Sequence, residues 1–202
     1  MKTAGKEVFF DILNIKIGGW FIIIKKSNGI ISVYHGTTYL FNEIDVAKGK
    51  PYKDFGRGFY VTENPNHAKN IALRNRKIEQ SRGDKNCCAY LYTFEFDETD
   101  ISKFNTKIFK EANIEWLKFV IANRKIRGKN HNFDIVMGPT ADDETMAVIN
   151  VYFEGLYGYI DSDDALNTLL KFIKPDVLPY QICFSTNKAV NLLTKKEEVK
   201  TL

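Results

Sequence analysis

The sequence predicts an α+β fold. Amphipathic helical segments and short apolar strand segments both occur along the 202 residues, without the strict strand–helix–strand alternation of a doubly wound parallel sheet. Hydrophobic residues make up 44% of the chain and aromatic residues 13%, which is enough apolar mass for a packed core and excludes a disordered chain. The length fits one domain, or one domain with an appended segment.

The composition narrows the function only slightly. The formal net charge of +4 gives weak support for an acidic partner such as a nucleotide or nucleic acid. The three cysteines, Cys87, Cys88 and Cys183, form neither a disulfide framework nor a chelating pattern, and the three histidines are widely scattered, so no metal site is predicted. Neither a signal peptide nor a membrane-spanning run is predicted, and the expected compartment is the cytoplasm.

The first predicted strands lie on either side of Asn28-Gly29, a pair that suits a tight hairpin turn. Residues 20–34 then form a β-hairpin. The alternative is a boundary near residue 28, with residues 1–28 as an N-terminal extension and residues 29–202 as the main domain. The sequence leaves both interpretations open.

A strand–helix–strand series follows. Residues 58–62 form a short strand preceded by glycines. Asn64 is a favourable N-cap and Pro65 suits the first helical position, so a helix is predicted over 65–80. Four basic residues are expected on its outer face: Lys69, Arg74, Arg76 and Lys77. The alternating pattern of residues 88–96 predicts the next strand.

The second half of the chain mixes helices and strands. Periodicity and capping predict four helices: over 111–126, over 142–155, from Asp161 or Ser162 to about residue 173, and a short one from Asn187. Apolar runs predict two strands, over 133–139 and over 180–186. A mixed sheet flanked by helices is therefore expected.

Two short motifs stand out. YHGT (residues 34–37) lies at the end of an apolar strand, and GRGFYVT (residues 56–62) leads into another. Glycines at these positions permit a close approach to the backbone, or a bulge. The second motif is not a dinucleotide-binding loop of the Rossmann type, because that loop needs three glycines and a helix directly after it, whereas a strand follows here.

In order and spacing, the two motifs resemble the N-terminal signature motifs of the ADP-ribosyltransferases, in the branch that contains diphtheria toxin and the poly(ADP-ribose) polymerases. From about residue 33 the chain also resembles a bacterial group assigned to this superfamily, whose later segment FDIVMGPTADD stands here at residues 133–143. The resemblance implies a split mixed β-sheet core with flanking helices, and NAD as a substrate without a metal.

The resemblance also implies roles for individual residues. The implied NAD-binding residues are His35, Gly36, Thr37, Arg57, Gly58, Phe59 and Tyr60. His35 is expected to bond a ribose hydroxyl, Gly36 to offer its backbone N–H and C=O to the carboxamide, and Tyr60 to stack on the nicotinamide ring. Thr37 supplies a nearby hydroxyl, and Arg57 is expected to reach a phosphate.

One position departs from the family pattern. A late strand should carry a catalytic glutamate, but the strand over 180–186 has Gln181 at the equivalent position. A glutamine can bond a ribose hydroxyl, yet without a charge it would stabilise a cationic transition state less, by about 1–3 kcal/mol. The implied catalytic residues are then His35, Tyr60 and Gln181. An alternative carboxylate is the acidic cluster Asp142, Asp143 and Glu144, whose simpler interpretation is a helix N-terminus that favours negative charge.

Three functions stay open from the sequence. The first is a mono-ADP-ribosyltransferase acting on a protein or nucleic acid; by analogy with small bacterial members it is the toxin of a toxin–antitoxin pair, with a small antitoxin protein as partner. The second is a catalytically inactive NAD- or protein-binding module, which Gln181 motivates. The third is an enzyme acting on RNA, which the basic helix face motivates.

Overall fold

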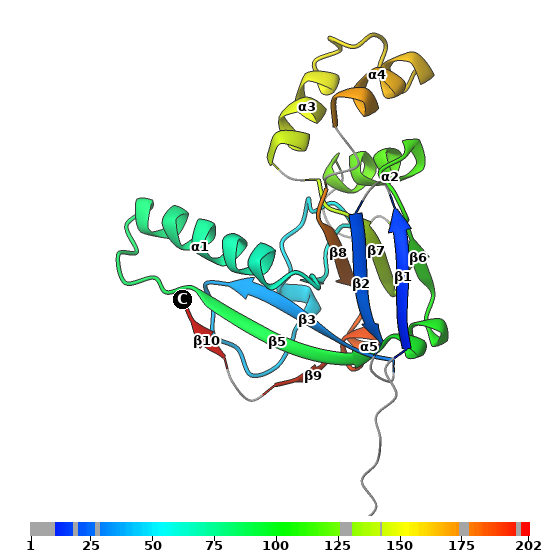
Figure 1. Cartoon of the computed structure of the whole chain (residues 1–202). Helices are drawn as coiled ribbons and strands as arrows, with labels where there is room; N and C mark the ends of the chain where they lie inside the picture. Colours follow the sequence, from blue (N-terminus) through cyan, green and yellow to red (C-terminus); the bar gives the residue numbers. More distant parts are fainter. Residues whose placement is uncertain are drawn as a thin grey trace, which may run out of the picture.

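The protein is described by a computed structural model that covers residues 11–17, 20–26, 29–125, 131–141, 143–173, 178–196 and 199–202. Within these residues there are five α-helices and ten β-strands (Figure 1). The strands form one two-stranded sheet and two four-stranded sheets. The predicted α+β class is confirmed. Each helix and strand predicted after residue 58 has a counterpart whose ends differ by only a few residues.

The first sheet is a two-stranded hairpin. β1 (Asp11–Ile17) and β2 (Trp20–Lys26) pair with each other along seven residues each in an antiparallel ladder. The predicted hairpin over residues 20–34 is wrong, because β2 pairs with β1 in a separate two-stranded sheet, whereas β3 (Ile30–Thr37) pairs with β5 (Tyr90–Asp97) in another sheet. Asn28 and residues 1–10 lie outside the described residues, and the domain boundary near residue 28 stays a prediction.

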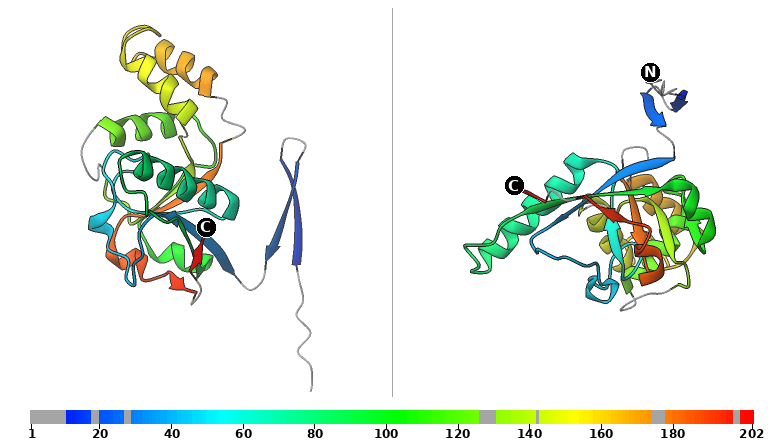
Figure 2. Two further views of the ribbon diagram at one scale, coloured as in Figure 1. Left: turned by 90° about the vertical axis from the view of Figure 1, so that its left-hand side faces the viewer. Right: turned by 90° about the horizontal axis from the view of Figure 1, so that it is seen from below.

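The second sheet is built on β5 (Tyr90–Asp97). Along one side β5 pairs with β3 (Ile30–Thr37) over its whole length. Along the other side it pairs with β9 (Thr194–Lys195) and β10 (Lys200–Thr201), and all these pairings are antiparallel. Figure 2 shows β10 beside β5 at the end of the chain. β9 and β10 were not predicted, because two residues give too short a pattern to recognise.

The third sheet has the strand order β4, β8, β7, β6. Its strands are β4 (Phe59–Val61), β8 (Tyr180–Phe184), β7 (Ile135–Pro139) and β6 (Thr106–Ile108). β6 and β7 run parallel, and the other neighbours are antiparallel. This mixed sheet places β8, which carries Gln181, between β4 and β7.

Both faces of the third sheet are buried. On β8, Ile182 and Phe184 point into a core shared with the second sheet, whereas Cys183 points into a core on the opposite face. This alternation is that of a strand with apolar layers on both sides. Three helices pack on the Cys183 face: α2 (Ile114–Lys125), α3 (Asp143–Phe153) and α4 (Asp163–Ile173). Figure 1 shows these three helices together at one end of the molecule.

α1 (Pro65–Ser81) packs along β3 and β5 on the second sheet (Figure 1). It begins as predicted: the Asn64 side chain accepts hydrogen bonds from the backbone N–H groups two and three residues on, and Pro65 occupies the first turn. Ala68 and Ala72 are buried against β3, and such small side chains let the helix backbone come close to the strand. α1 therefore forms one wall beside the end of β3.

Candidate functional site

A pocket opens where the second and third sheets part. β3 and β4 are joined by one antiparallel bridge, in which Tyr34 N–H donates to the Thr62 carbonyl at 2.8 Å and Thr62 N–H donates to the Tyr34 carbonyl at 3.0 Å. Past this bridge β3 continues with β5, and β4 with β8. A pocket of about 740 Å³ lies there, lined by β3, β4, β8, α1 and the loop before β4.

Seven of the eight predicted site residues line this pocket: His35, Gly36, Thr37, Gly58, Phe59, Tyr60 and Gln181. They come from three strands, β3, β4 and β8, and from the loop into β4. The structure therefore brings the two N-terminal motifs and the late strand to one place. The eighth predicted site residue, Arg57, does not line the pocket.

His35 is a neutral hydrogen-bonding group in this pocket. Its Nδ1 lies 2.7 Å from the Tyr60 carbonyl oxygen, and its ring packs on Phe59 with the centroids 4.4 Å apart. Burial lowers the pKa of His35 to about 4, although the bond to Tyr60 opposes this shift. A carbonyl only accepts, so the proton of the neutral ring is on Nδ1, and Nε2 is an acceptor for a ligand hydroxyl.

Gly36 turns its backbone polar groups toward β4. The N–H and C=O of Tyr34 both bond to Thr62. In an antiparallel strand the backbone groups of residues two apart point to the same edge, so the N–H and C=O of Gly36 also point to this edge. The absence of a side chain has a second cause: a Cβ on Gly36 would lie 1.8 Å from the Ala68 carbonyl oxygen. The sequence explained this glycine by ligand approach alone, whereas the packing of α1 on β3 requires it as well.

Tyr60 presents a fixed aromatic ring to the pocket. Its hydroxyl donates to the Gly56 carbonyl at 2.6 Å and accepts from the Phe55 N–H at 3.1 Å, and the rings of Phe55 and Tyr60 are stacked 6.5 Å apart. Burial raises the pKa of the phenol well above its ordinary value, and the nearby Cys183 and Asp54 add to this effect. The ring is therefore neutral and held at both ends, as a stacking surface requires.

Two other predicted binding residues have local structural contacts. The Thr37 hydroxyl oxygen accepts from the Tyr39 N–H at 3.2 Å, which shapes the turn that leaves β3. Gly58 lies so close to β8 that a Cβ there would come within 2.4 Å of the Cys183 sulfur. Thr37 shapes the pocket wall through its hydroxyl, and Gly58 through the close approach of its backbone to β8.

Arg57 does not line the pocket, and its side chain is bonded to neighbouring loop carbonyls. Its guanidinium donates to the carbonyl oxygens of Ala47, at 2.8 Å, and of Gly49. These carbonyls lie at and just after the short helix η1 (Val46–Lys48), so Arg57 ties the loop after β3 to the loop before β4. The expected contact of Arg57 with a phosphate stays a prediction that this geometry does not favour.

Gln181 is paired with a carboxylate that the sequence analysis missed. The Gln181 Nε2 donates to Asp54 Oδ2 at 2.8 Å, and the Asp54 side chain in turn accepts from Arg124 of α2. Asp54 is only 4% exposed, and it stands two residues before the second motif. Its partners lie 70 and 127 residues later in the chain, so no local pattern marks it.

Charged residues of both signs line the pocket. Five basic residues line it: Lys48, Lys50, Lys53, Arg74 and Arg124. Four acidic residues line it too: Glu43, Asp45, Asp54 and Glu79. Burial lowers the pKa of Lys53, the Asp54 carboxylate opposes this shift, and the neighbouring Arg124, Lys50 and Arg74 lower the pKa further. A bound anion at this cluster would relieve the mutual repulsion of the cations.

The acidic cluster Asp142, Asp143 and Glu144 lies at the start of α3, just after Ala141 in the pocket wall. Asp142 and the side chains of Asp143 and Glu144 lie outside the described part of the structure. The cluster therefore stays an alternative prediction. Among the described residues, no group of three or more His, Cys, Asp or Glu side chains is placed to hold a metal ion.

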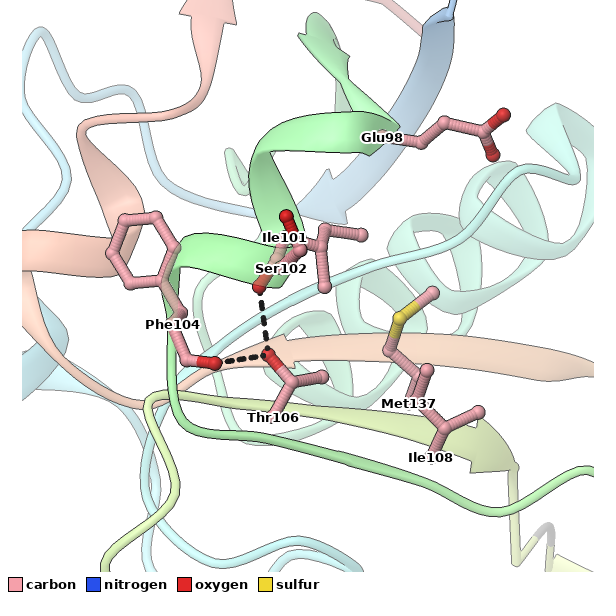
Figure 3. Close-up of a pocket in the computed structure, with 7 residues that line it drawn as sticks. All are labelled: Glu98, Ile101, Ser102, Phe104, Thr106, Ile108 and Met137. Atoms are coloured by element: carbon pink, nitrogen blue, oxygen red, sulfur yellow. Dashed lines mark hydrogen bonds between the residues drawn. The ribbon is translucent and has the colours of Figure 1, made fainter.

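A second depression, of about 490 Å³, lies between η2 (Glu98–Lys103), β6 and β7. Figure 3 shows its lining: Glu98, Ile101, Ser102, Phe104, Thr106, Ile108 and Met137. The Thr106 hydroxyl there lies within hydrogen-bond distance of the carbonyl oxygens of Ile101 and Phe104 (Figure 3). None of the predicted site residues lines this depression.

The described residues form an α+β fold with a pocket between two sheets, and no helix among them is long and apolar enough to cross a membrane. Residues 31–194 match the model of a protein family described as a protein of unknown function, DUF3990. The chain belongs to this family. Neither the curated proteins nor the solved structures gave a significant match.

Proposed function

We propose that the protein binds NAD in the pocket between β3 and β4 and acts as a mono-ADP-ribosyltransferase with an ADP-ribosyltransferase-like split sheet. The observation that carries the proposal is the convergence of His35, Tyr60 and Gln181, from three strands, on one pocket. These are the positions at which the resemblance implies ribose and nicotinamide contacts.

The nicotinamide ring fits between Gly36 and Tyr60. The N–H and C=O of Gly36 face β4 and form a donor–acceptor pair of the kind that a carboxamide satisfies with two hydrogen bonds. The Tyr60 ring, anchored at its hydroxyl, offers an aromatic face worth about 1 kcal/mol in stacking. Together these groups would hold the leaving group in one orientation.

The ribose and the phosphates have their own partners. His35 Nε2 and the Gln181 amide oxygen are two acceptors for ribose hydroxyls on opposite sides of the pocket, since they come from β3 and β8. Lys53 and its neighbouring cations replace Arg57 as the partners of the pyrophosphate in this proposal.

The reaction breaks the bond between the nicotinamide nitrogen and the ribose carbon. The electron pair leaves with nicotinamide, positive charge develops on the ribose, and an acceptor nucleophile forms the new bond and loses its proton. The protein contributes orientation of the leaving group and electrostatic stabilisation of the cation. Poly(ADP-ribose) chain growth is not proposed, because position 181 has no charge of its own.

The test is to incubate the full chain with NAD and a bacterial extract, and to measure nicotinamide release and labelled ADP-ribose on protein and nucleic acid. His35→Ala and Tyr60→Ala should reduce both signals by about tenfold or more, as the loss of one well-made contact predicts. Tyr159→Ala removes a tyrosine that is 91% exposed and distant in sequence from the pocket, and it is the matched control. Failure of the unmodified chain to bind NAD would overturn the proposal.

A catalytically inactive binding module is the second candidate. It is favoured by the neutral Gln181, whose nitrogen is already bonded to Asp54. NAD binding measured by calorimetry, without nicotinamide release in the presence of extract, would support this candidate. Labelled ADP-ribose on any macromolecule would exclude it.

The RNA-acting candidate loses support from the positions of the basic residues on α1. Arg76 donates to the Leu202 carbonyl at 2.6 Å and Arg74 lines the pocket, so Lys69 and Lys77 are left as the exposed basic residues of that predicted face outside the pocket. The toxin role, the antitoxin partner and the cytoplasmic location rest on analogy and compositional expectation. Growth arrest on expression, relieved by His35→Ala, would support the toxin role.

A further inference from the structure

Asp54 is a buried carboxylate with every acceptor position occupied. Its Oδ1 accepts from Arg124 Nε at 2.9 Å and from Arg124 Nη2 at 2.5 Å. Its Oδ2 accepts from the Ala141 N–H at 3.0 Å and from Gln181 Nε2 at 2.8 Å. A carboxylate has about four lone-pair sites, so these four donors leave Asp54 no capacity for a ligand.

The pairing with Asp54 determines how the Gln181 amide is oriented. An ionised carboxylate only accepts, so the amide must turn its nitrogen toward Asp54. The amide oxygen is then at the other end of the group, on a residue that lines the pocket. Among the described residues, no donor is recorded for this oxygen, which leaves it to accept from a ligand hydroxyl.

We propose that Asp54 is a positioning residue of the NAD site: it orients Gln181 so that the amide oxygen is an acceptor for a ribose hydroxyl. This inference rests on the proposed function for the identity of the ligand. The Asp54–Gln181 coupling itself rests on geometry alone. Gln181, oriented by Asp54, would supply the hydroxyl acceptor that the glutamate supplies in the family that the chain resembles.

The proposal has a consequence opposite to the one the resemblance suggests. Gln181→Glu introduces the glutamate of the family pattern, so the resemblance alone would predict a more active site. In this pocket it places a second carboxylate oxygen about 2.8 Å from Asp54 Oδ2. Two carboxylates so close hold one proton between them, and one of the pair has a strongly raised pKa. Above that pKa the pair repels and the site loses its shape.

The groups around the pair decide the pH range of the test. The titratable and charged groups near it are Lys53 and Lys50 in the loop, Arg124 on α2, Arg74 on α1, Tyr60 on β4, Cys183 on β8 and His35 on β3. Burial keeps His35 neutral above a pKa of about 4 and raises the pKa of Tyr60, so both are neutral between about pH 5 and pH 8. His67, which also lines the pocket, is the same in every variant, so the comparison between the variants isolates the titration of the new pair.

The experiment compares the full chain with Gln181→Glu, Asp54→Asn and the double variant. Urea unfolding at about pH 5 and about pH 8 measures the coupling without NAD, and calorimetric titration with NAD measures the site. Gln181→Glu should resemble the unmodified chain at the lower pH, where its protonated carboxyl can donate to Asp54. At the higher pH it should be less stable and bind NAD at least about tenfold more weakly.

Asp54→Asn, alone and together with Gln181→Glu, tests whether the effects depend on the carboxylate of Asp54. Asp54→Asn in the Gln181→Glu background removes the repulsion and should abolish most of the pH dependence. Asp54→Asn alone lets the Gln181 amide turn over and should weaken NAD binding by about tenfold while leaving nicotinamide binding unchanged. Asp134→Asn is the matched control, because Asp134 accepts from Asn105 N–H at 3.2 Å and from Thr186 Oγ1 at 2.9 Å outside the pocket.

Two results would overturn the proposal. The first is a Gln181→Glu protein that binds NAD as tightly at pH 8 as the unmodified chain does. The second is equal pH dependence of unfolding in Gln181→Glu and in the control. If the unmodified chain does not bind NAD, the proposed function fails, and the unfolding measurements then decide the Asp54–Gln181 coupling by themselves.

Discussion

The two depressions of the molecule differ in what they bury. The pocket between β3 and β4 is lined by the ion pair of Asp54 and Arg124, and by Gln181 and His35, each of which uses only one end of its polar group in the hydrogen bonds described above. The depression of Figure 3 has one charged residue, Glu98, and its Thr106 hydroxyl already contacts two backbone carbonyls. Volume alone does not separate a site from a surface hollow, whereas buried charge beside unused hydrogen-bonding groups does.

The largest expected effect is at the ion pair of the first pocket. Arg124→Ala leaves the buried Asp54 carboxylate without its main partner, and the side chains of the pair are only 22% and 5% exposed. Breaking such a pair should lower the free energy of unfolding by about 3–5 kcal/mol, measured by urea unfolding at neutral pH. Lys103→Ala beside the Figure 3 depression breaks the pair with Asp100 and is the control.

Lys103 is 70% exposed, so its substitution should change stability little. An equal loss in the two variants would contradict the comparison between the two depressions.

The next effect is at the strand edge of the first pocket. In Gly36→Ala the new methyl group would lie 1.8 Å from the Ala68 carbonyl oxygen, so α1 must move away from β3. Overpacking of this kind should cost about 3 kcal/mol, measured by thermal and urea unfolding. Gly83→Ala is the control: its Cβ would meet nothing within 4 Å, although its φ of +112° adds strain. A Gly36→Ala protein of normal stability would show that this edge is loose.

A pH effect follows from His35. Its pKa is about 4 in the folded protein and about 6.5 in the unfolded chain, so the unfolded chain binds more protons between these values and stability falls as the pH falls. Between pH 7.5 and pH 5 this group should remove about 2 kcal/mol from the free energy of unfolding. His35→Gln, which can still donate to the Tyr60 carbonyl, should show a smaller loss over the same range. Parallel pH profiles for the two proteins would refute the assignment.

The smallest effect is expected in the second depression. Thr106→Val removes a hydroxyl that contacts the carbonyls of Ile101 and Phe104 at 3.2 and 3.3 Å. One such neutral contact is worth about 1 kcal/mol, and NAD binding should not change. Urea unfolding and calorimetry check both statements. A change in NAD affinity would show that the Figure 3 depression belongs to the site.

The sequence predicted elements that carry their own local signals. Asn64 and Pro65 define the start of α1 through a cap and a fixed dihedral angle, and both function in that way in the structure. The alternation of residues 88–96 likewise predicted β5. The same reasoning failed for the hairpin over residues 20–34, because the turn signal of Asn28-Gly29 does not decide which strand becomes the partner of β2.

The sequence predicted the site residues that lie in short motifs, and it missed the contacts between residues far apart in the chain. His35, Gly36 and Tyr60 lie in short motifs, and all three line the pocket. The Asp54 network joins residues that are 70 to 127 positions apart, and only the packing of α2 and β8 brings them together. The expected contact of Arg57 with a phosphate stays a prediction, and the carbonyls that Arg57 binds belong to a loop whose path the sequence does not give.

The bridge between Tyr34 and Thr62 joins the second and third sheets beside the site, and this junction is called the seam below. A ligand held by Gly36 on one strand and by Tyr60 on the next would add contacts between the two sheets to the two backbone hydrogen bonds of the bridge. Occupancy at about 100 times the dissociation constant would add about 2.7 kcal/mol to the free energy of unfolding. The amide protons of Tyr34 and Thr62 would then exchange with solvent more slowly, so hydrogen exchange at these two residues reports whether the seam is closed.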